Sequence, residues 1–270
     1  MFENSFDNRF VKVKVVGVNT ASEKISGGIA ALNCMIEKNL PSVNYIAIDR
    51  PGTDDLDACN ARKRFLVPSM ADERNLVRTL RGANLIFIVA DEVWENVKAT
   101  AVAAHCAKKI GVPVIFIAGG NFEDAEDEII FDALIKLPSK NFAEDSCKVV
   151  KNFIEAVTLP GQPKIDVAGI AELVKDSLVF IGYGERNGKN AVIKAAKAAL
   201  EHVENFAENF KDSREILFNV TAAFGNLSLE EAQKISRIIK RHAPKAEISF
   251  GFSIDDWLVD KVKCLIVATK

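Results

Sequence analysis

The stretch LFNVTAAFGNLSLEEAQKISRIIKRHAPKAEISFGFSIDDWLVDKVKCLIVAT, residues 217–269, decides the fold of this chain. Apolar residues dominate three short runs in this part, which predict strands over residues 215–222, 246–254 and 262–269. Between the first two runs, apolar residues recur at helical spacing and predict a helix over residues 228–242. The C-terminal part therefore alternates strands with a helix and ends on two consecutive strands.

The region just upstream continues this alternation. A short helix is predicted over residues 167–175, a strand over residues 177–184, and an Ala-rich helix from about residue 189 towards residue 210. We expect this second half to form a smaller α+β unit, with a mixed sheet and helices on one side.

The first half of the chain reads as an α/β domain. Apolar runs that predict strands alternate with amphipathic segments that predict helices, and parallel strands need such crossover connections. We therefore expect a Rossmann-like parallel sheet with helices on both faces. The predicted strands are residues 10–18, 43–49, 84–90, 113–118 and 131–137, and the predicted helices are residues 29–38, 73–80 and 97–110.

The most evident break in the chain is PGQP, residues 160–163, which ends a helix predicted over residues 146–159. This break places the boundary between the two halves. We predict a Rossmann-like domain over residues 1–142, a central connecting helix over residues 143–162, and a C-terminal domain over residues 163–270.

Composition excludes several classes of function. The formal net charge is −2, so no global field draws the chain to nucleic acid or to an anionic membrane. No long apolar segment resembles a signal peptide or a membrane span, so we expect a cytoplasmic protein without direct membrane insertion. The five cysteines are widely spaced and form no CxxC pair, and we interpret them as reduced core residues rather than metal ligands.

Several motifs, in one collinear order over residues 10–269, resemble those of the FtsZ and tubulin superfamily. FGFSIDDWLVDKVKCLIVAT is similar to the FtsZ pattern FGxxxDDxxxDxVxVTVIAT, and IGYGERNGKNAVIKAAKAA resembles MGxGxxxGxxRAxxAA with Ala191 in place of the arginine. VKVVGV, RTLRGANLIFIVA and FDALIKLPSKNF are similar to FtsZ motifs of the first half. The resemblance implies a degenerate nucleotide-binding domain first and an FtsZ-type C-terminal domain last.

The resemblance also implies a GTP site at the carboxyl ends of the parallel strands, and its most diagnostic loop is missing here. Members of the family carry GGGTGTG, whose glycines let backbone N–H groups close around phosphate oxygens. The matching residues 91–100 read DEVWENVKAT, with no glycine. We interpret this segment as the cap of a helix that starts near Val97, with Glu95 or Asn96 satisfying its free N–H groups.

A residual nucleotide or anion site is conceivable from four residues, Lys24, Gly27, Gly28 and Asp49. The glycines precede a predicted helix with the lysine close by, an arrangement able to bind one anion. Turn and helix-cap roles explain the same residues at least as well. The family's base-recognition motif NDR corresponds here to residues 139–141, SKN.

The resemblance places a hydrolysis loop of type N-x-D-x-x-D at Lys164, Asp166 and Gly169. In the family, the acids of this loop enter the neighbouring subunit's pocket and polarise the attacking water. Only Asp166 remains, as a remnant catalytic acid or as a helix N-cap. Loss of such a group typically costs on the order of 10²- to 10⁴-fold in rate, so we expect little GTPase activity.

Three hypotheses follow. The first is an FtsZ-like cytoskeletal or division-related protein that needs no cofactor and associates head to tail with itself or with FtsZ-like subunits. The second is a working GTPase that binds GTP or GDP through rebuilt loops, using Lys24, Gly27, Gly28 and Lys98. The third is that the vacated crevice binds another small ligand or is an enzyme site. The sequence stops at Lys270, directly after the last predicted strand, so we expect no recruitment to membranes through a terminal peptide.

Overall fold

The computed structural model describes the chain in ten stretches that hold its regular elements. These stretches are residues 11–18, 27–40, 43–49, 55–67, 70–91, 94–119, 131–137, 139–174, 177–207 and 209–270.

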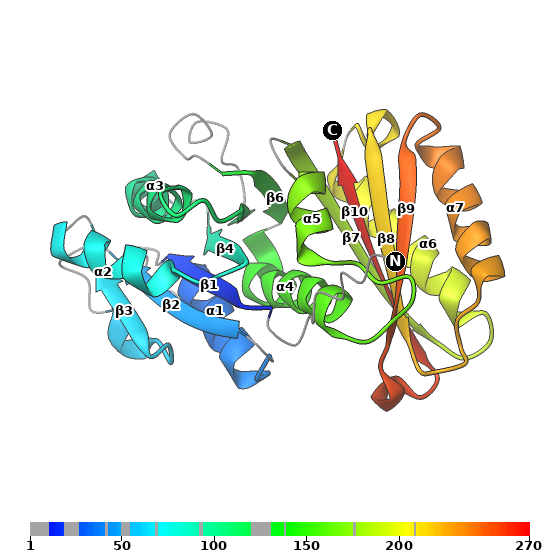
Figure 1. Cartoon of the computed structure of the whole chain (residues 1–270), viewed down its shortest axis with the longest axis horizontal. Helices are drawn as coiled ribbons and strands as arrows, with labels where there is room; N and C mark the ends of the chain where they lie inside the picture. The colour runs from blue at the N-terminus through cyan, green and yellow to red at the C-terminus, as the bar shows by residue number, and fades with distance from the viewer. Residues whose placement is uncertain are drawn as a thin grey trace, which may run out of the picture.

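The first half is a parallel α/β domain, as the sequence predicts. Its strands lie in the order β3-β2-β1-β4-β5-β6, and every neighbouring pair is parallel (Figure 1). The elements are β1 (Val13–Val18), α1 (Gly28–Glu37), β2 (Val43–Asp49), the 3-10 turn η2 (Asp55–Ala58), β3 (Lys63–Leu66), α2 (Met70–Leu80), β4 (Leu85–Ala90), α3 (Trp94–Lys108), β5 (Val114–Gly119) and β6 (Ala133–Leu137).

The second half begins with a long helix and continues in a mixed sheet. Within the described residues, strand β7 joins the second sheet to the first by pairing parallel with β6 at its first two residues. The elements are the 3-10 turn η3 (Ser139–Asn141), α4 (Phe142–Thr158), α5 (Val167–Val174), β7 (Ser177–Asn187), α6 (Ala191–Phe206), the 3-10 turn η4 (Phe210–Asp212), β8 (Glu215–Ala222), α7 (Leu229–His242), β9 (Glu247–Ile254), the 3-10 turn η5 (Asp256–Leu258) and β10 (Lys261–Thr269).

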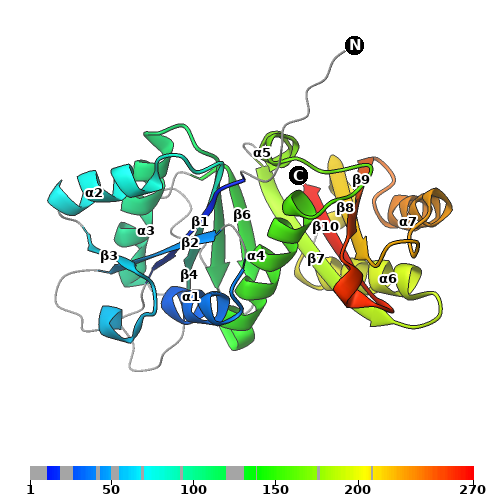
Figure 2. The same ribbon diagram turned by 60° about the horizontal axis from the view of Figure 1, so that its bottom comes forward.

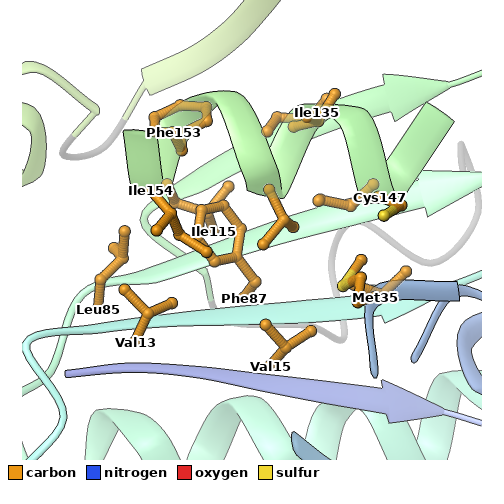
Figure 3. Close-up of a cluster of buried hydrophobic side chains, with 14 of the residues drawn as sticks. Val13, Val15, Met35, Leu85, Phe87, Ile115, Ile135, Cys147, Phe153 and Ile154 are labelled. Atoms are coloured by element: carbon orange, nitrogen blue, oxygen red, sulfur yellow. The ribbon is translucent and has the colours of Figure 1, made fainter. Parts of the chain in front are cut away.

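Helices cover both faces of the first sheet, and its central strands are buried between them. Strands β1, β4 and β5 are buried at every residue. Side chains on one face of these strands pack against α1 and α4, and those on the other face pack against α2 and α3. Figure 3 shows the first of these cores, where Phe153 and Ile154 of α4 lie over Phe87 and Ile115 of the sheet. The rings of Phe87 and Phe153 meet edge to face at 5.6 Å between centroids.

The second sheet differs from the expected arrangement with helices on one side. Helices α6 and α7 cover one face, as expected. Leu217 and Leu265 point to the opposite face and belong to the same core as α4 and α5. Helix α4 therefore lies between the two sheets and packs on both (Figures 1 and 2).

Some helices and strands have bounds that differ from the predicted ones, because the local sequence pattern does not define their ends. Helix α4 begins at Phe142, four residues before the expected start at Ser146, because Phe142 is buried and two acids favour the first helical turn. Strand β7 extends to Asn187 because it pairs with β10 along its length. Strand β3 was not predicted, since its four residues, KRFL, are exposed or half-buried at the sheet edge. The predicted three-part division of the chain stays a prediction.

Candidate functional site

The candidate site is the crevice at the carboxyl ends of the parallel strands, where ligands of open α/β sheets bind. Strands β1, β2, β4 and β5 end there, and helices α1, α3 and α4 begin there. The segments that directly follow these strands fall largely outside the described residues. Lys24, one of the predicted ligands, lies in such a segment.

Gly27 and Gly28 occupy the N-terminus of α1, and their backbone geometry needs glycine. Gly27 has a φ of 92°, in the region that side chains disfavour. A Cβ on Gly28 would lie 2.2 Å from the carbonyl oxygen of Val89 and 2.4 Å from that of Val18. The helix therefore starts in direct contact with the backbones of β1 and β4. This close approach explains Gly28 without a ligand.

The N-cap position of α1 is a glycine, so it supplies no side chain to bond the free N–H groups of the helix. The first turn of the helix holds no acidic residue. The free N–H groups and the positive end of the helix dipole favour an anion at this position.

Asp49 lies at the same edge of the sheet. It is the last residue of β2, directly after Ile48, which pairs with Val18 of β1. Its carbonyl oxygen accepts a hydrogen bond of 2.7 Å from the N–H of Val67, and the residue is only 3% exposed. The structure thus brings Asp49 and Gly28 to neighbouring strand ends, and their predicted role in binding a nucleotide or anion stays a prediction.

Helix α3 starts earlier than expected. It begins at Trp94, whereas the sequence placed its start near Val97. Glu95 and Asn96 therefore belong to its first turn and not to a loop before the helix, and the expected capping role for them stays a prediction. The predicted start was placed at Val97 because the helical spacing of apolar residues begins there. Residues 94–97 contain no glycine or proline that would prevent the helix from starting at Trp94. Lys98 is exposed one turn into the helix.

An aromatic ring covers the end of β5. Phe142, the first residue of α4, is 4% exposed, and a Cβ on Gly119 would lie 2.8 Å from its ring. The turn η3, which holds the SKN residues, precedes this phenylalanine directly, and the side chain of Asn141 caps no helix. The contact between Gly119 and Phe142 could not be predicted from the sequence, because a glycine at a strand end ordinarily indicates a turn.

Asp166 lies at the other end of α4, which has seventeen residues and so spans roughly 25 Å. Its Oδ1 accepts a hydrogen bond of 2.6 Å from the N–H of Gly169. Asp166 therefore caps the N-terminus of α5, the second of the two roles considered for it. The exposed Lys164 and Gly169 lie beside it, and Ile165 between them is buried. The length of α4 keeps this loop away from the crevice of the same chain.

Comparison with known proteins begins with the C-terminal half. Residues 178–270 match the FtsZ family, C-terminal domain. Over 308 aligned residues the chain is 25% identical to the cell division protein FtsZ of Magnetospirillum gryphiswaldense, an alignment that covers 96% of this chain and 54% of the relative. The chain thus spans about half the length of that curated relative.

Solved structures share the fold of the whole chain. An empty FtsZ dimer from M. jannaschii superposes with a TM-score of 0.77 at 18% identity, covering 96% of this chain and 88% of that one. A GTPgS-bound protofilament of CetZ2 from Haloferax volcanii gives a TM-score of 0.74 at 13% identity, covering 96% and 94%. Residues 178–270 thus match the C-terminal domain of the FtsZ family, and the whole chain has the fold of FtsZ and CetZ. At these identities the likeness to FtsZ and CetZ structures concerns the fold alone.

A polar cluster that sequence reasoning missed joins the two halves of this FtsZ-type fold. The hydroxyl of Tyr183 donates to Oδ1 of Asp145 at 2.8 Å, and the ammonium of Lys148 lies 3.2 Å from the same oxygen. The rings of Tyr183 and His202 are 4.2 Å apart. Burial, followed by the bond to Asp145, raises the pKa of Tyr183 to about 12. Burial lowers the pKa of His202. The four residues come from α4, β7 and α6, so no local spacing links them.

The described residues of this FtsZ-type fold contain neither a membrane-spanning helix nor a cluster of metal ligands. No helix among them is long and apolar enough to cross a bilayer. No group of three or more His, Cys, Asp or Glu side chains within those stretches could hold a metal ion. Of the five cysteines, four are buried and Cys34 is half-buried, all as free thiols.

Proposed function

We propose that this chain is an FtsZ-like cytoskeletal or division-related protein that acts by associating with itself or with FtsZ-like subunits, with little or no GTPase activity. The observation that carries the proposal is the junction of β4 and α3. Asp91 follows the strand directly, the helix begins at Trp94, and residues 91–100 contain no glycine.

This junction does not fit a triphosphate. A phosphate cradle needs backbone N–H groups that approach the ligand without an intervening Cβ. Here each position carries a side chain, and three of them, Asp91, Glu92 and Glu95, are acids. A like-charge contact at about 4 Å costs on the order of a few kcal/mol at the effective dielectric of a protein surface. The ring of Phe142 against Gly119 adds bulk at the next strand end.

The hydrolysis loop supports the same proposal. Its one remaining acid, Asp166, is engaged with the N–H of Gly169, and Gly169 itself has no side chain to orient water. Two separate parts of one mechanism are therefore replaced. No catalytic step is assigned to this chain.

Association is proposed from the retained architecture. The loop at Asp166 and the crevice at Gly28 lie at opposite ends of α4, so only a neighbouring subunit brings one against the other. Repetition of such a heterologous contact gives an open filament. One solved relative is described as an FtsZ dimer and another as a CetZ2 protofilament, which supports assembly for this chain too.

Sedimentation tests this proposal directly. Purified protein is pelleted with and without GTP, alone and mixed with an FtsZ, and phosphate release is followed in parallel. We expect association that does not depend on GTP, and turnover far below that of the FtsZ control. A strict monomer that also fails to bind FtsZ contradicts the proposal.

The alternative is a GTP-dependent assembling protein with rebuilt loops. The N-terminus of α1, whose N-cap is a glycine, favours it, as does the exposed Lys98 near the start of α3. Calorimetric titration with GTP and Mg²⁺ separates the two. Micromolar affinity that falls in a Lys98→Ala variant supports the alternative.

A further inference from the structure

A second hollow lies at the edge of the first sheet opposite the strand-end crevice. Its walls come from the first residues of β2 and β3, the start of β1 and the last turn of α2, and parallel strands begin at the same edge. Its volume is about 720 Å³, in the range of pockets that hold nucleotide-sized ligands. In Figure 1 this edge belongs to the left-hand part of the molecule, beside α2 and β3.

The lining of this hollow is basic. Among the described residues, its lining includes four cationic side chains and no aspartate or glutamate. The cationic residues are Lys14, Arg62, Lys63 and Arg78. The chain as a whole carries a formal charge of −2, so this concentration of positive charge is a local feature.

Three of these cations have no partner among the residues that the structure describes, whereas the neighbouring Arg64 has several. Arg62, Lys63 and Arg78 are exposed and form no ion pair or side-chain hydrogen bond among the described residues. The adjacent Arg64 donates to the carbonyl oxygens of Cys59 and Ala61 at 2.6 and 3.1 Å and lies 3.8 Å from Asp57. Arg64 therefore holds the loop in place, and its two neighbours are left available to a ligand.

The fourth cation, Lys14, is held in position by hydrogen bonds to the backbone of the protein. Lys14 is 8% exposed, and its ammonium donates to the carbonyl oxygens of Thr79 and Arg81 at the end of α2. An ammonium has three donors, so one remains for a ligand. Burial, with a smaller contribution from Lys12, lowers the pKa of Lys14. A bound anion would oppose this lowering by direct attraction to the ammonium.

Part of the neutral lining is also polar and held in position by hydrogen bonds. The N–H of Asn60 donates to Oδ1 of Asn33 at 2.8 Å, and the hydroxyl of Tyr45 donates to the carbonyl oxygen of Met35 at 3.2 Å. Asn39 and Asn44 add amide groups at the rim. Amides can donate to phosphate oxygens or bond to a sugar or a base.

We propose that this hollow binds a small polyphosphate anion, such as a nucleoside triphosphate or inorganic tripolyphosphate. Arg62 and Arg78 contribute guanidinium groups from the loop before β3 and from α2, and such groups bind phosphate oxygens through paired hydrogen bonds. The site is separate from the strand-end crevice and does not rest on the function proposed above.

Calorimetric titration of the full chain with sodium tripolyphosphate, ATP, GTP and adenosine tests the proposal. We expect all three polyphosphates to bind and adenosine not to bind. Affinity should fall as salt rises from about 50 to 300 mM, because exposed charges are screened over a few ångströms at the higher value. Removal of both guanidinium groups in Arg62→Ala/Arg78→Ala should weaken binding on the order of 100-fold, about 10-fold for each group.

A charge-matched control is Arg241→Ala/Lys245→Ala, which removes two exposed cations near the end of α7 in the other half of the chain. This variant should bind tripolyphosphate like the parent. Arg78→Glu serves as a second variant if the double variant unfolds below the parent temperature, and it should abolish binding alone.

Four results would overturn the proposal. They are no binding at low salt, equal losses in the two double variants, binding that survives Arg62→Ala/Arg78→Ala but falls in Lys98→Ala, and binding of poly-glutamate in place of tripolyphosphate. The third result moves the ligand to the strand-end crevice and supports the GTP-binding alternative. The fourth indicates an acidic protein partner.

Discussion

The ammonium of Lys263 lies 3.0 and 2.9 Å from the two carboxylate oxygens of Glu155, and both side chains are largely buried. Lys263 belongs to β10 and Glu155 to α4, so this ion pair ties the long helix to the second sheet. Residues 108 positions apart in the sequence thus fix how α4 lies between the two halves.

Breaking this ion pair should destabilise the fold. Lys263→Met leaves Glu155 buried with only the more distant Lys151, at 3.7 Å, and should lower the free energy of unfolding by about 3 kcal/mol. The double variant Lys263→Met/Glu155→Met should recover most of that loss, because no buried charge is left unpaired. Urea unfolding measures both.

A matched control for this prediction is Lys261→Met on the same strand. Lys261 lies 3.8 Å from Glu185, and both side chains are about half exposed. Its loss should change the free energy of unfolding by less than about 1 kcal/mol. Equal effects of the Lys261 and Lys263 substitutions would contradict the structural role given to the buried pair.

Gly28 should tolerate no side chain. A Cβ 2.2 Å from the carbonyl oxygen of Val89 forces α1 away from the sheet, so Gly28→Ala should destabilise the chain by at least about 1 to 3 kcal/mol. Gly169→Ala is the control, because its Cβ meets only the flexible Asp166 carboxylate, at 3.1 Å. Alanine in that helix should be neutral or stabilising by a few tenths of a kcal/mol. Thermal unfolding of both variants decides whether Gly28 is a packing residue.

Most of the fold could be predicted because its strands are long apolar runs with clear breaks between them. Strands β2 and β8 were predicted at their observed bounds, since the pattern that defines them is local. The pairing of β6 with β7 could not be predicted, because it joins residues more than forty positions apart through only two pairs. Strand β3 was not predicted, because an exposed edge strand needs no alternation of apolar and polar residues.

The candidate site was less predictable than the fold. The absence of glycine from residues 91–100 is legible in the sequence, and Gly28 and Asp49 did prove to lie at neighbouring strand ends. Contacts that form only through tertiary packing could not be predicted from the sequence. Phe142 reaches Gly119, and Tyr183 reaches Asp145, only once α4 is placed across the sheet.

Acid should destabilise the chain through His202. Burial lowers its folded pKa below the ordinary value of 6.5, so the unfolded state takes up the proton first. The contribution is present above pH 6.5 and is lost as the pH falls through the folded pKa. Asp145, Lys148 and Tyr183 are the charged or titratable groups near the ring, and the bond from Tyr183 holds the Asp145 carboxylate.

Urea unfolding at pH 8 and pH 5 measures this dependence. His202→Gln should show a smaller loss between the two values than the parent. His105→Gln is the control, because His105 is exposed on α3 and should leave the profile unchanged. Identical profiles for the parent and the His202 variant would show that other groups dominate the acid response.

Asp166 should act on stability and leave nucleotide turnover unchanged. Its carboxylate caps α5 through the N–H of Gly169, so Asp166→Ala should lower the free energy of unfolding by about 1 kcal/mol. Asp166→Asn should retain most of the cap, because an amide oxygen accepts the same bond.

A catalytic acid behaves differently, since both substitutions then reduce phosphate release on the order of 10²- to 10⁴-fold. Measuring unfolding and phosphate release on the parent, the two variants and the neighbouring control Lys164→Ala separates the roles. A fall in turnover shared by Asp166→Ala and Asp166→Asn, with stability unchanged, would make Asp166 catalytic and restore the GTPase hypothesis.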